Sequence, residues 1–256
     1  MRALMHTAFF ALISSLLVSM NMAQAGEDAL YAAEAPDGAA FIRVVNADAS
    51  GAIARASVGD KVIKEVSPLE ASPYIYLPEG NYQVDVAGQQ TSVNMKKNEF
   101  YTVVVLDSGE MKVMKDVAFD NPRKALLSFY NLTSNSGVTL KTSDGKVAVI
   151  DAVGSLDVAN REINAVSIAL GAFQSNKALA TTSEVNLQRG KVFSVFAIDV
   201  GGEPRLVVAE TEWIHRYEAG VQRPWIMGAG CARAAQRRGC KGQRRRAARV
   251  QHRTLL

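Results

Sequence analysis

Side chains that could act as a nucleophile, a base or a metal ligand are scarce in this chain of 256 residues. It has three histidines and two cysteines, and only one of these five residues, His215, lies in residues 26–227. Nucleophilic catalysis by serine or cysteine needs an imidazole beside the nucleophile, and a transition-metal site needs several histidine or cysteine ligands. His215 also follows the last strand that the sequence pattern indicates. We therefore expect no catalytic residues, no metal site and no cofactor.

Two aspartates, Asp107 and Asp199, occupy matched positions in an internal repeat and could form a pair of carboxylates. Each precedes a glycine-containing turn, Ser-Gly-Glu in the first case and Val-Gly-Gly-Glu in the second. Aspartate is common in such turns because its carboxylate accepts hydrogen bonds from the neighbouring backbone. The pattern therefore favours a structural role in the turns over a shared active site.

Tyr74 and Tyr76 form the clearest aromatic pair in the chain. Pro73 and Pro78 bracket them, which is typical of an edge strand, and side chains two residues apart on a strand point to the same face. On an exposed face the two rings would stack on sugar rings or contact a partner protein. On the alternative interpretation, which the sequence favours, the rings fold onto the core of the domain.

Basic side chains recur in the repeat and provide a second candidate surface. A turn in the first copy carries Lys96 and Lys97, its counterpart carries Arg189, and the strands that close the two copies carry Lys112 and Arg205. A cationic strip of these residues would hold a polyanion by screened, non-specific attraction. The simpler interpretation, which the sequence favours, is that they are solvated residues at the rim of a sheet.

These residues are positioned by two stretches, 93–107 and 185–199, that align without a gap. In each stretch an apolar run is followed by a short polar turn, K-K-N-E or Q-R-G-K, and by a second apolar run that ends in aspartate. We interpret each as a hairpin of two strands, followed by a glycine turn and a closing strand. The chain is therefore predicted to use one β unit twice.

Strand signals continue along the chain, and no window of a dozen residues carries an apolar stripe at helical period. Residues 41–47 are apolar and β-branched, residues 53–66 show strand, Gly-Asp turn and strand, and residues 125–132 restart the series. The predicted fold is all-β, with two consecutive antiparallel β-sandwich domains related by internal duplication. We expect the domains at residues 26–116 and 125–212, with a linker at residues 117–124.

The two ends of the chain differ in composition from this body. Residues 1–25 combine a basic start, a short apolar run and an Ala-Gln-Ala site, which is typical of a cleaved signal peptide. Residues 213–256 are expected to be irregular and disordered, and from Gly228 onward they contain nine Lys or Arg residues and no acid. Of the 29 basic residues these nine and Arg2 lie outside residues 26–227, which leaves 19 against 25 acidic residues and a net charge of −6.

Several separated segments together resemble the AlgF family of alginate biosynthesis proteins. They follow one another in order between residues 28 and 208, and they are D-A-L-Y at 28–31, A-P-D-G at 35–38, F-I-R-V-V-N-A at 41–47, L-P-E-G-N-Y at 77–82, L-K-T-S-D-G-K at 140–146, R-E-I-N at 161–164 and V-N-L-Q-R-G at 185–190. The resemblance implies a periplasmic accessory protein of alginate O-acetylation and no catalytic motif to carry over. The chain departs from the family at its C-terminus, since the family ends soon after the second unit.

We therefore expect a non-catalytic periplasmic protein that supports acetyl transfer to mannuronate through contacts with periplasmic and membrane-bound acetyltransferase components. It would lie peripheral to the inner membrane and bind no nucleic acid. Binding of alginate itself is expected to be weak, because the acidic body repels a polyuronate within a Debye length of ~8 Å. One alternative is a carbohydrate-binding module that holds the polymer through Tyr74 and Tyr76, and another is an enzyme that depends on His215.

Overall fold

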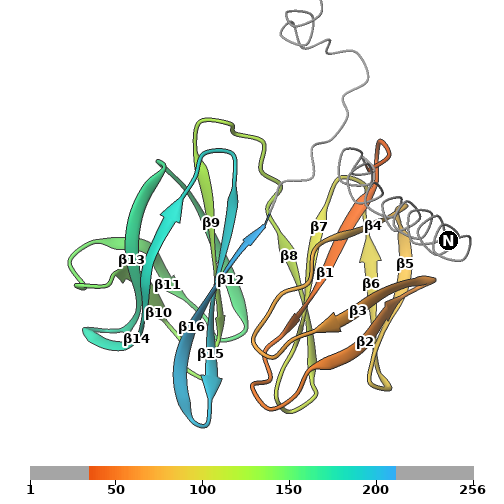
Figure 1. The fold of residues 1–256 in the computed structure, drawn as a ribbon, viewed down its shortest axis with the longest axis horizontal. Coiled ribbons are helices and arrows are strands. Elements are labelled where there is room, and N and C mark those ends of the chain that lie inside the picture. Colours follow the sequence, from red (N-terminus) through yellow and green to blue (C-terminus); the bar gives the residue numbers. More distant parts are fainter. Residues whose placement is uncertain (1–34, 212–256) are drawn as a thin grey trace, which may run out of the picture. The chain divides into compact units, whose positions relative to one another are not determined.

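The computed structural model describes residues 35–211, and within this range the chain forms sixteen β-strands and no helix (Figure 1). The predicted signal peptide, residues 213–256 and His215 lie outside the described residues. Residues 35–211 include no helix that could cross a membrane. The strands build two sandwiches in succession, which confirms the predicted all-β fold.

The first sandwich consists of two four-stranded sheets. One sheet has the order β4-β1-β7-β8, from Ile75–Leu77, Ala40–Asn46, Phe100–Val105 and Met111–Asp116. The other has the order β3-β2-β5-β6, from Lys61–Val66, Ile53–Val58, Gly80–Val86 and Gln89–Met95. Their facing side chains form one apolar core, in which residues such as Val44, Val84 and Val103 are completely buried.

The second sandwich repeats this plan. One sheet has the order β12-β9-β15-β16, from Asp157–Ile163, Ala125–Leu132, Val192–Val200 and Glu203–Thr211. The other has the order β11-β10-β13-β14, from Ala148–Val153, Val138–Thr142, Val166–Gln174 and Lys177–Leu187. Strand for strand, β9 to β16 take the sheet positions of β1, β2, β3 and their successors, with β12 in the place of β4. The duplication that the sequence predicted is therefore a duplication of topology.

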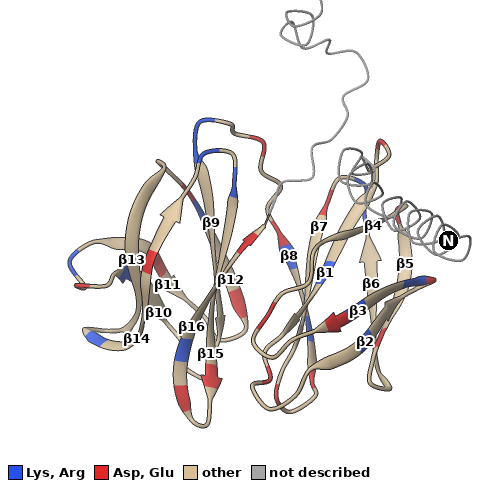
Figure 2. Cartoon of the chain, in the orientation of Figure 1, with Lys and Arg blue, Asp and Glu red and all other residues tan. Residues whose placement is uncertain are grey.

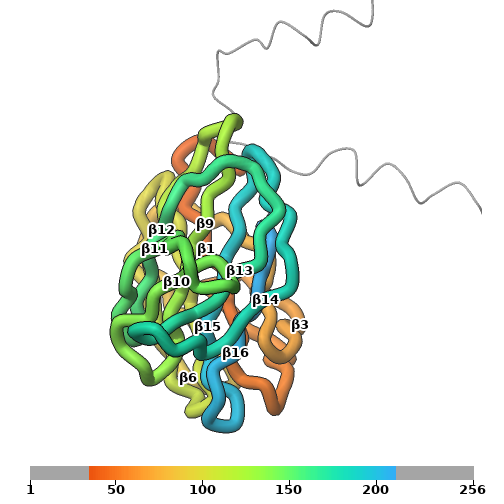
Figure 3. The backbone as a smooth tube through the Cα atoms, turned by 90° about the vertical axis from the view of Figure 1, so that its left-hand side faces the viewer, coloured from red at the N-terminus to blue at the C-terminus, as the bar shows by residue number. Residues whose placement is uncertain are grey.

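The strand pairing differs from the expected antiparallel pattern at one place in each sandwich. β1 pairs with β7 in parallel, and β9 pairs with β15 in parallel (Figure 1), while every other pair in the described sheets is antiparallel. The side view in Figure 3 shows the antiparallel sheet β11-β10-β13-β14 of the second sandwich, with its strands in this order. All residues of β1, β7 and β9 are buried, on both faces of their sheets. Continuous apolar runs are typical of parallel strands, because such strands are covered from both sides.

The two stretches interpreted as hairpins contain the expected strands and turns, but the predicted hairpin pairing is wrong. β6 and β7 belong to opposite sheets, and so do β14 and β15. The reason is that β7 already pairs with β1 along one edge and β8 along the other, which leaves no edge for β6. The turn at residues 96–99 therefore carries the chain across the core, and the apolar side chains of β6 and β7 meet from opposite sheets.

The hairpin predicted around the Gly-Asp turn is confirmed. β2 and β3 pair from Val58 opposite Lys61 outward, with only Gly59 and Asp60 between them. Gly59 has φ +58°, and a Cβ at this position would lie 2.8 Å from the ring of Tyr82. Two-residue hairpin turns favour glycine where φ is positive. Here the nearby ring of Tyr82 also leaves no room for the Cβ of another residue.

A pair of buried asparagines holds the corner after the first strand of each sandwich. The amide of Asn46 donates to the carbonyls of Gly51 and Val66, at 2.8 and 3.2 Å. The amide of Asn131, its counterpart in the repeat, donates to the carbonyls of Asn135, Val153 and Gly154, at 2.7 to 3.1 Å. Both side chains are completely buried and bind backbone carbonyls of residues that follow the strand, so the repeated asparagine fixes the repeated corner.

Candidate functional site

Tyr74 and Tyr76 lie on one face, as predicted, at the edge strand β4 and the residues just before it. Both rings pack on the apolar cluster around Phe41 and Phe100, and the ring of Tyr74 meets that of Phe100 edge-on at 5.4 Å. The hydroxyl of Tyr74 donates to Asp116 at 2.7 Å. Tyr74 is therefore engaged inside the protein, and both tyrosines are only half-buried rather than openly displayed.

The basic residues of the repeat are all exposed, and the structure does not gather them into one strip (Figure 2). Lys96 and Lys97 lie in the turn before Phe100, whereas Lys112 pairs with Val104 near the other end of β7. The two lysines of the turn are therefore separated from Lys112 by four residues of β7, on the order of 13 Å, and by part of the turn itself.

The same separation holds in the second sandwich. Arg189 lies in the turn before β15, and Arg205 pairs with Ile198 towards the end of that strand. The turn of Arg189 does meet the linker, because the backbone amide of Gly190 donates to the carbonyl of Lys124 at 2.7 Å. A local basic area at this turn is thus supported, but a continuous track along the strand is not.

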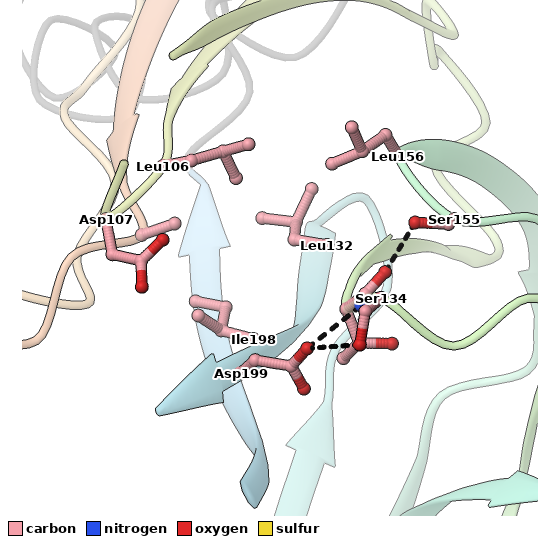
Figure 4. A pocket seen from close by; sticks show the side chains of 10 residues that line it. Leu106, Asp107, Leu132, Ser134, Ser155, Leu156, Ile198 and Asp199 are labelled. Atoms are coloured by element: carbon pink, nitrogen blue, oxygen red, sulfur yellow. Dashed lines mark hydrogen bonds between the residues drawn. The ribbon is translucent and has the colours of Figure 1, made fainter. Parts of the chain in front are cut away.

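The matched aspartates lie at one pocket between the two sandwiches (Figure 4). The pocket has a volume of about 280 Å³, and its apolar lining includes Leu106, Leu132 and Ile198. The carboxylate of Asp199 does not cap its own turn as the sequence suggested; it accepts hydrogen bonds from the backbone amide and hydroxyl of Ser134, at 2.9 and 3.0 Å. The duplication therefore brings equivalent positions of the two units to a single place.

Next to this pocket the two sandwiches share an apolar contact, because Ala47, Leu132 and Ile198 belong both to the pocket lining and to the contact. The residues on the outward faces of the two doubly covered sheets form one buried cluster, which includes Val45, Ala47, Val104, Met114, Tyr130, Leu132, Phe196 and Ile198. Both sandwiches also belong to one compact unit of the chain. The outward faces of β1, β7, β9 and β15 are apolar because each sheet covers the other.

A buried arginine, Arg43, lies in this contact and binds residues of both sandwiches. Its guanidinium donates to Thr102 of the first sandwich at 2.9 Å, and to Tyr130 and Ser194 of the second at 2.9 Å each. A further bond reaches Thr211 at 3.1 Å. Arg43 is 1% exposed, and a buried charge of this kind is tolerated only when it is paired and hydrogen-bonded.

Asp116 is the anionic partner of this group. Its carboxylate accepts hydrogen bonds from Thr102 and Tyr130 at 2.5 Å each, and from Tyr74 at 2.7 Å. Burial acts to lower the pKa of Arg43, but the oxygens of Tyr130, Tyr74 and Asp116 raise it above its ordinary value. Burial raises the pKa of Tyr74 and Tyr130, so both phenols remain protonated and donate. We call the following seven residues the Arg43 network: Arg43, Tyr74, Thr102, Asp116, Tyr130, Ser194 and Thr211.

The sequence interpretation missed this network. One signal was present, because Arg43 interrupts the apolar run F-I-R-V-V-N, where an unpaired charge could not be buried. Its partners lie up to 168 residues away along the chain, so no local pattern identifies them. Among the described residues, the structure shows no group of His, Cys, Asp and Glu side chains that could hold a metal ion.

Comparison with known proteins relates this chain to one protein family. The family model described as "Alginate O-acetyl transferase AlgF" matches residues 13–194. The "Alginate biosynthesis protein AlgF" of Pseudomonas aeruginosa is 38% identical over 189 residues, which covers 74% of this chain and 86% of the relative. The protein of the same name from Pseudomonas syringae pv. tomato is 34% identical over 191 residues, which covers 75% of this chain and 85% of the relative.

A solved structure of the C-terminal domain of AlgF from P. aeruginosa is also similar, with 36% identity, 34% of this chain and 98% of that chain covered, and a TM-score of 0.32. The family match extends over well more than half of the chain and includes most of both sandwiches. The relatives agree with it over about three quarters of the chain. The chain belongs to the AlgF family.

Proposed function

We propose that this protein is a non-catalytic accessory component of alginate O-acetylation, which acts in the periplasm through contacts with acetyltransferase partners. The observation that carries the proposal is the family match, since the family is named for alginate O-acetyl transfer and the relatives for alginate biosynthesis. A role in alginate O-acetylation follows from the family. The accessory, periplasmic and partner-dependent character of that role is the proposal itself.

The composition of the described residues supports a role without chemistry of its own. Residues 35–211 contain neither histidine nor cysteine, the two side chains that most often activate or form a nucleophile. The hydroxyls of Ser194 and Thr102, which lie beside the charged Arg43, are completely buried. A substrate therefore has no access to them in this structure.

The proposal is tested by separating loss of acetylation from loss of catalysis. In an alginate-producing strain that lacks this gene, we expect acetyl esters on the polymer to disappear and to return with the wild-type chain. The purified chain alone, given an acetyl donor and mannuronate oligomers, should transfer no acetyl groups. In the complemented strain the chain should be recovered from the periplasmic fraction and begin at Gly26. Acetyl transfer by the purified chain, or recovery from the cytoplasm, would contradict the proposal.

The contact with alginate is expected to be weak and sensitive to salt. Residues 26–227 carry a net charge of −6, so only local basic areas such as the turn with Lys96 and Lys97 attract a polyuronate, and salt screens that attraction. Titration with mannuronate oligomers should give dissociation constants near or above the millimolar range. Raising the salt from 50 to 500 mM should abolish measurable binding.

The alternative function, a carbohydrate-binding module, predicts a different outcome from the same titration. It requires free aromatic faces, and a stacked ring contributes tight binding that salt hardly changes. Tyr76→Ala removes the aromatic ring that is outside the Arg43 network and should leave oligomer binding unchanged under our proposal. Lys96→Gln/Lys97→Gln is the matched variant that should weaken it. The reverse pattern would favour the binding module.

A further inference from the structure

The pocket between the sandwiches has a chemical character that the accessory role does not explain. Its apolar wall includes the side chains of Leu106, Leu132, Leu156 and Ile198, and carboxylates from both sandwiches lie at the same opening (Figure 4). None of the described residues that line it is a lysine or an arginine. A pocket with apolar walls and uncompensated carboxylates selects for ligands of one charge type.

The two carboxylates differ in how far the protein satisfies them. Asp199 accepts two hydrogen bonds from Ser134, which orients its carboxylate and leaves further acceptor sites, since a carboxylate has about four. Asp107 is exposed, and within the described part of the chain its side chain has no hydrogen-bond or ion-pair partner. The pocket therefore presents one oriented and one free carboxylate above an apolar wall.

The complement of such a pocket is an amphipathic cation. Lysine and arginine side chains combine an aliphatic stem, which packs on apolar surface, with a charged head that remains near water. The planar guanidinium of arginine donates in a fixed fork and suits carboxylate acceptors best. A uronate chain has the wrong sign for this opening, and a volume of about 280 Å³ lies below the usual range of about 300–1,000 Å³ for small-molecule sites.

We propose that this pocket receives a single cationic side chain, arginine by preference, from a basic segment of a partner protein. The proposal rests on the accessory function proposed above and gives its partner contact a chemistry. The duplication explains the position of the site, because Asp107 and Asp199 are equivalent residues of the two units. The pocket requires both sandwiches, and neither unit alone provides its lining.

A minimal probe tests the chemistry directly. The full chain, with labelled Leu and Ile methyl groups, is titrated at low salt with n-butylguanidinium, and separately with butyrate of similar length. We expect the guanidinium to shift the methyl signals of Leu132 and Ile198 and butyrate to leave them unchanged. Equal shifts with butyrate, or shifts spread over the whole surface, would overturn the proposal.

Charge-removing variants provide the matched control. Asp107→Asn/Asp199→Asn keeps an acceptor oxygen for Ser134 and should weaken guanidinium binding about three- to tenfold, as expected for two partly exposed ion pairs. Asp60→Asn/Asp120→Asn removes the same number of charges from exposed residues that do not line the pocket, and should have no effect. Equal weakening by both variants would reduce the effect to net charge and reject the site.

Acetylation in cells separates this inference from the function on which it rests. If the pocket holds a partner, Asp107→Asn/Asp199→Asn should restore fewer acetyl esters than the wild type or the control variant. Full restoration by that variant would reject the pocket as a partner site and leave the accessory function intact. Failure of the wild-type chain to restore acetylation would instead reject the accessory function. The titration with n-butylguanidinium would still test the binding chemistry of the pocket.

Discussion

Asp116→Ala is expected to lower the free energy of unfolding by about 3–5 kcal/mol, since each buried group left without its hydrogen-bond partner costs about 1–3 kcal/mol. The carboxylate accepts three hydrogen bonds, from Tyr74, Thr102 and Tyr130. Without it, three hydroxyls lose their acceptor and the charge of Arg43 remains buried without an anion. Urea unfolding, monitored by circular dichroism and by tyrosine fluorescence, measures this decrease in the free energy of unfolding.

Two companion variants show whether charge or packing is responsible. Asp116→Asn keeps an acceptor and should cost less than alanine does. Arg43→Met/Asp116→Leu removes both charges and should recover only the part of the loss that comes from the uncompensated charge of Arg43, because the hydroxyls still lack their acceptor. If Asp116→Ala costs less than about 1 kcal/mol, the network is not the stabilising group that its geometry indicates.

Asn131→Ala should be strongly destabilising although it lies outside the Arg43 network. Its side chain is completely buried, binds the carbonyls of Asn135, Val153 and Gly154, and accepts from Thr133. Each buried polar group left without a partner costs about 1–3 kcal/mol, so we expect a total near 3 kcal/mol. For a chain of this size that corresponds to a fall in Tm of about 6–12 °C, measurable by calorimetry.

The repeat itself supplies the comparisons for this variant. Asn46→Ala alters the equivalent corner of the first sandwich and should act in the same direction. Asn94→Ala changes an asparagine that is also repeated in the sequence but is exposed on β6, and should alter stability by less than about 0.5 kcal/mol. An effect of Asn94→Ala as large as that of Asn131→Ala would show that repetition, rather than burial, marks the important asparagines.

The strands were predictable because their signals are local. Alternating or continuous apolar runs and the Gly-Asp turn place β1, β2, β3 and β9 from neighbouring residues alone. Strand partners depend instead on which edges are already occupied, and this is why the turn at residues 96–99 was wrongly interpreted as the end of a hairpin. The parallel pairing of β1 with β7 was equally inaccessible, although their uninterrupted apolar runs indicated cover on both faces.

The candidate residues also divide into those whose environment follows from local sequence and those whose environment depends on distant residues. Exposure of Lys96, Lys97 and Arg189 follows from their position in polar turns, and the shared face of Tyr74 and Tyr76 follows from the period of a strand. The binding of Tyr74 to Asp116 could not be predicted, because residues 42 positions apart meet only in the folded protein. The same holds for the pocket, since a sequence alignment matches Asp107 with Asp199 without showing that they converge.

The Arg43 network also has a consequence for the order in which the chain assembles. Arg43 is on β1, the first of the described strands, whereas Thr211 is the last residue of β16, the last of the described strands, and is 168 positions away. Contacts between distant parts of a chain form late, since the loop between them must close first. Each sandwich has its own apolar core, but the full set of hydrogen bonds from Arg43 forms only when the end of β16 is in place. A chain that ends just before Thr211 would therefore leave the Arg43 guanidinium with three of its four hydrogen bonds.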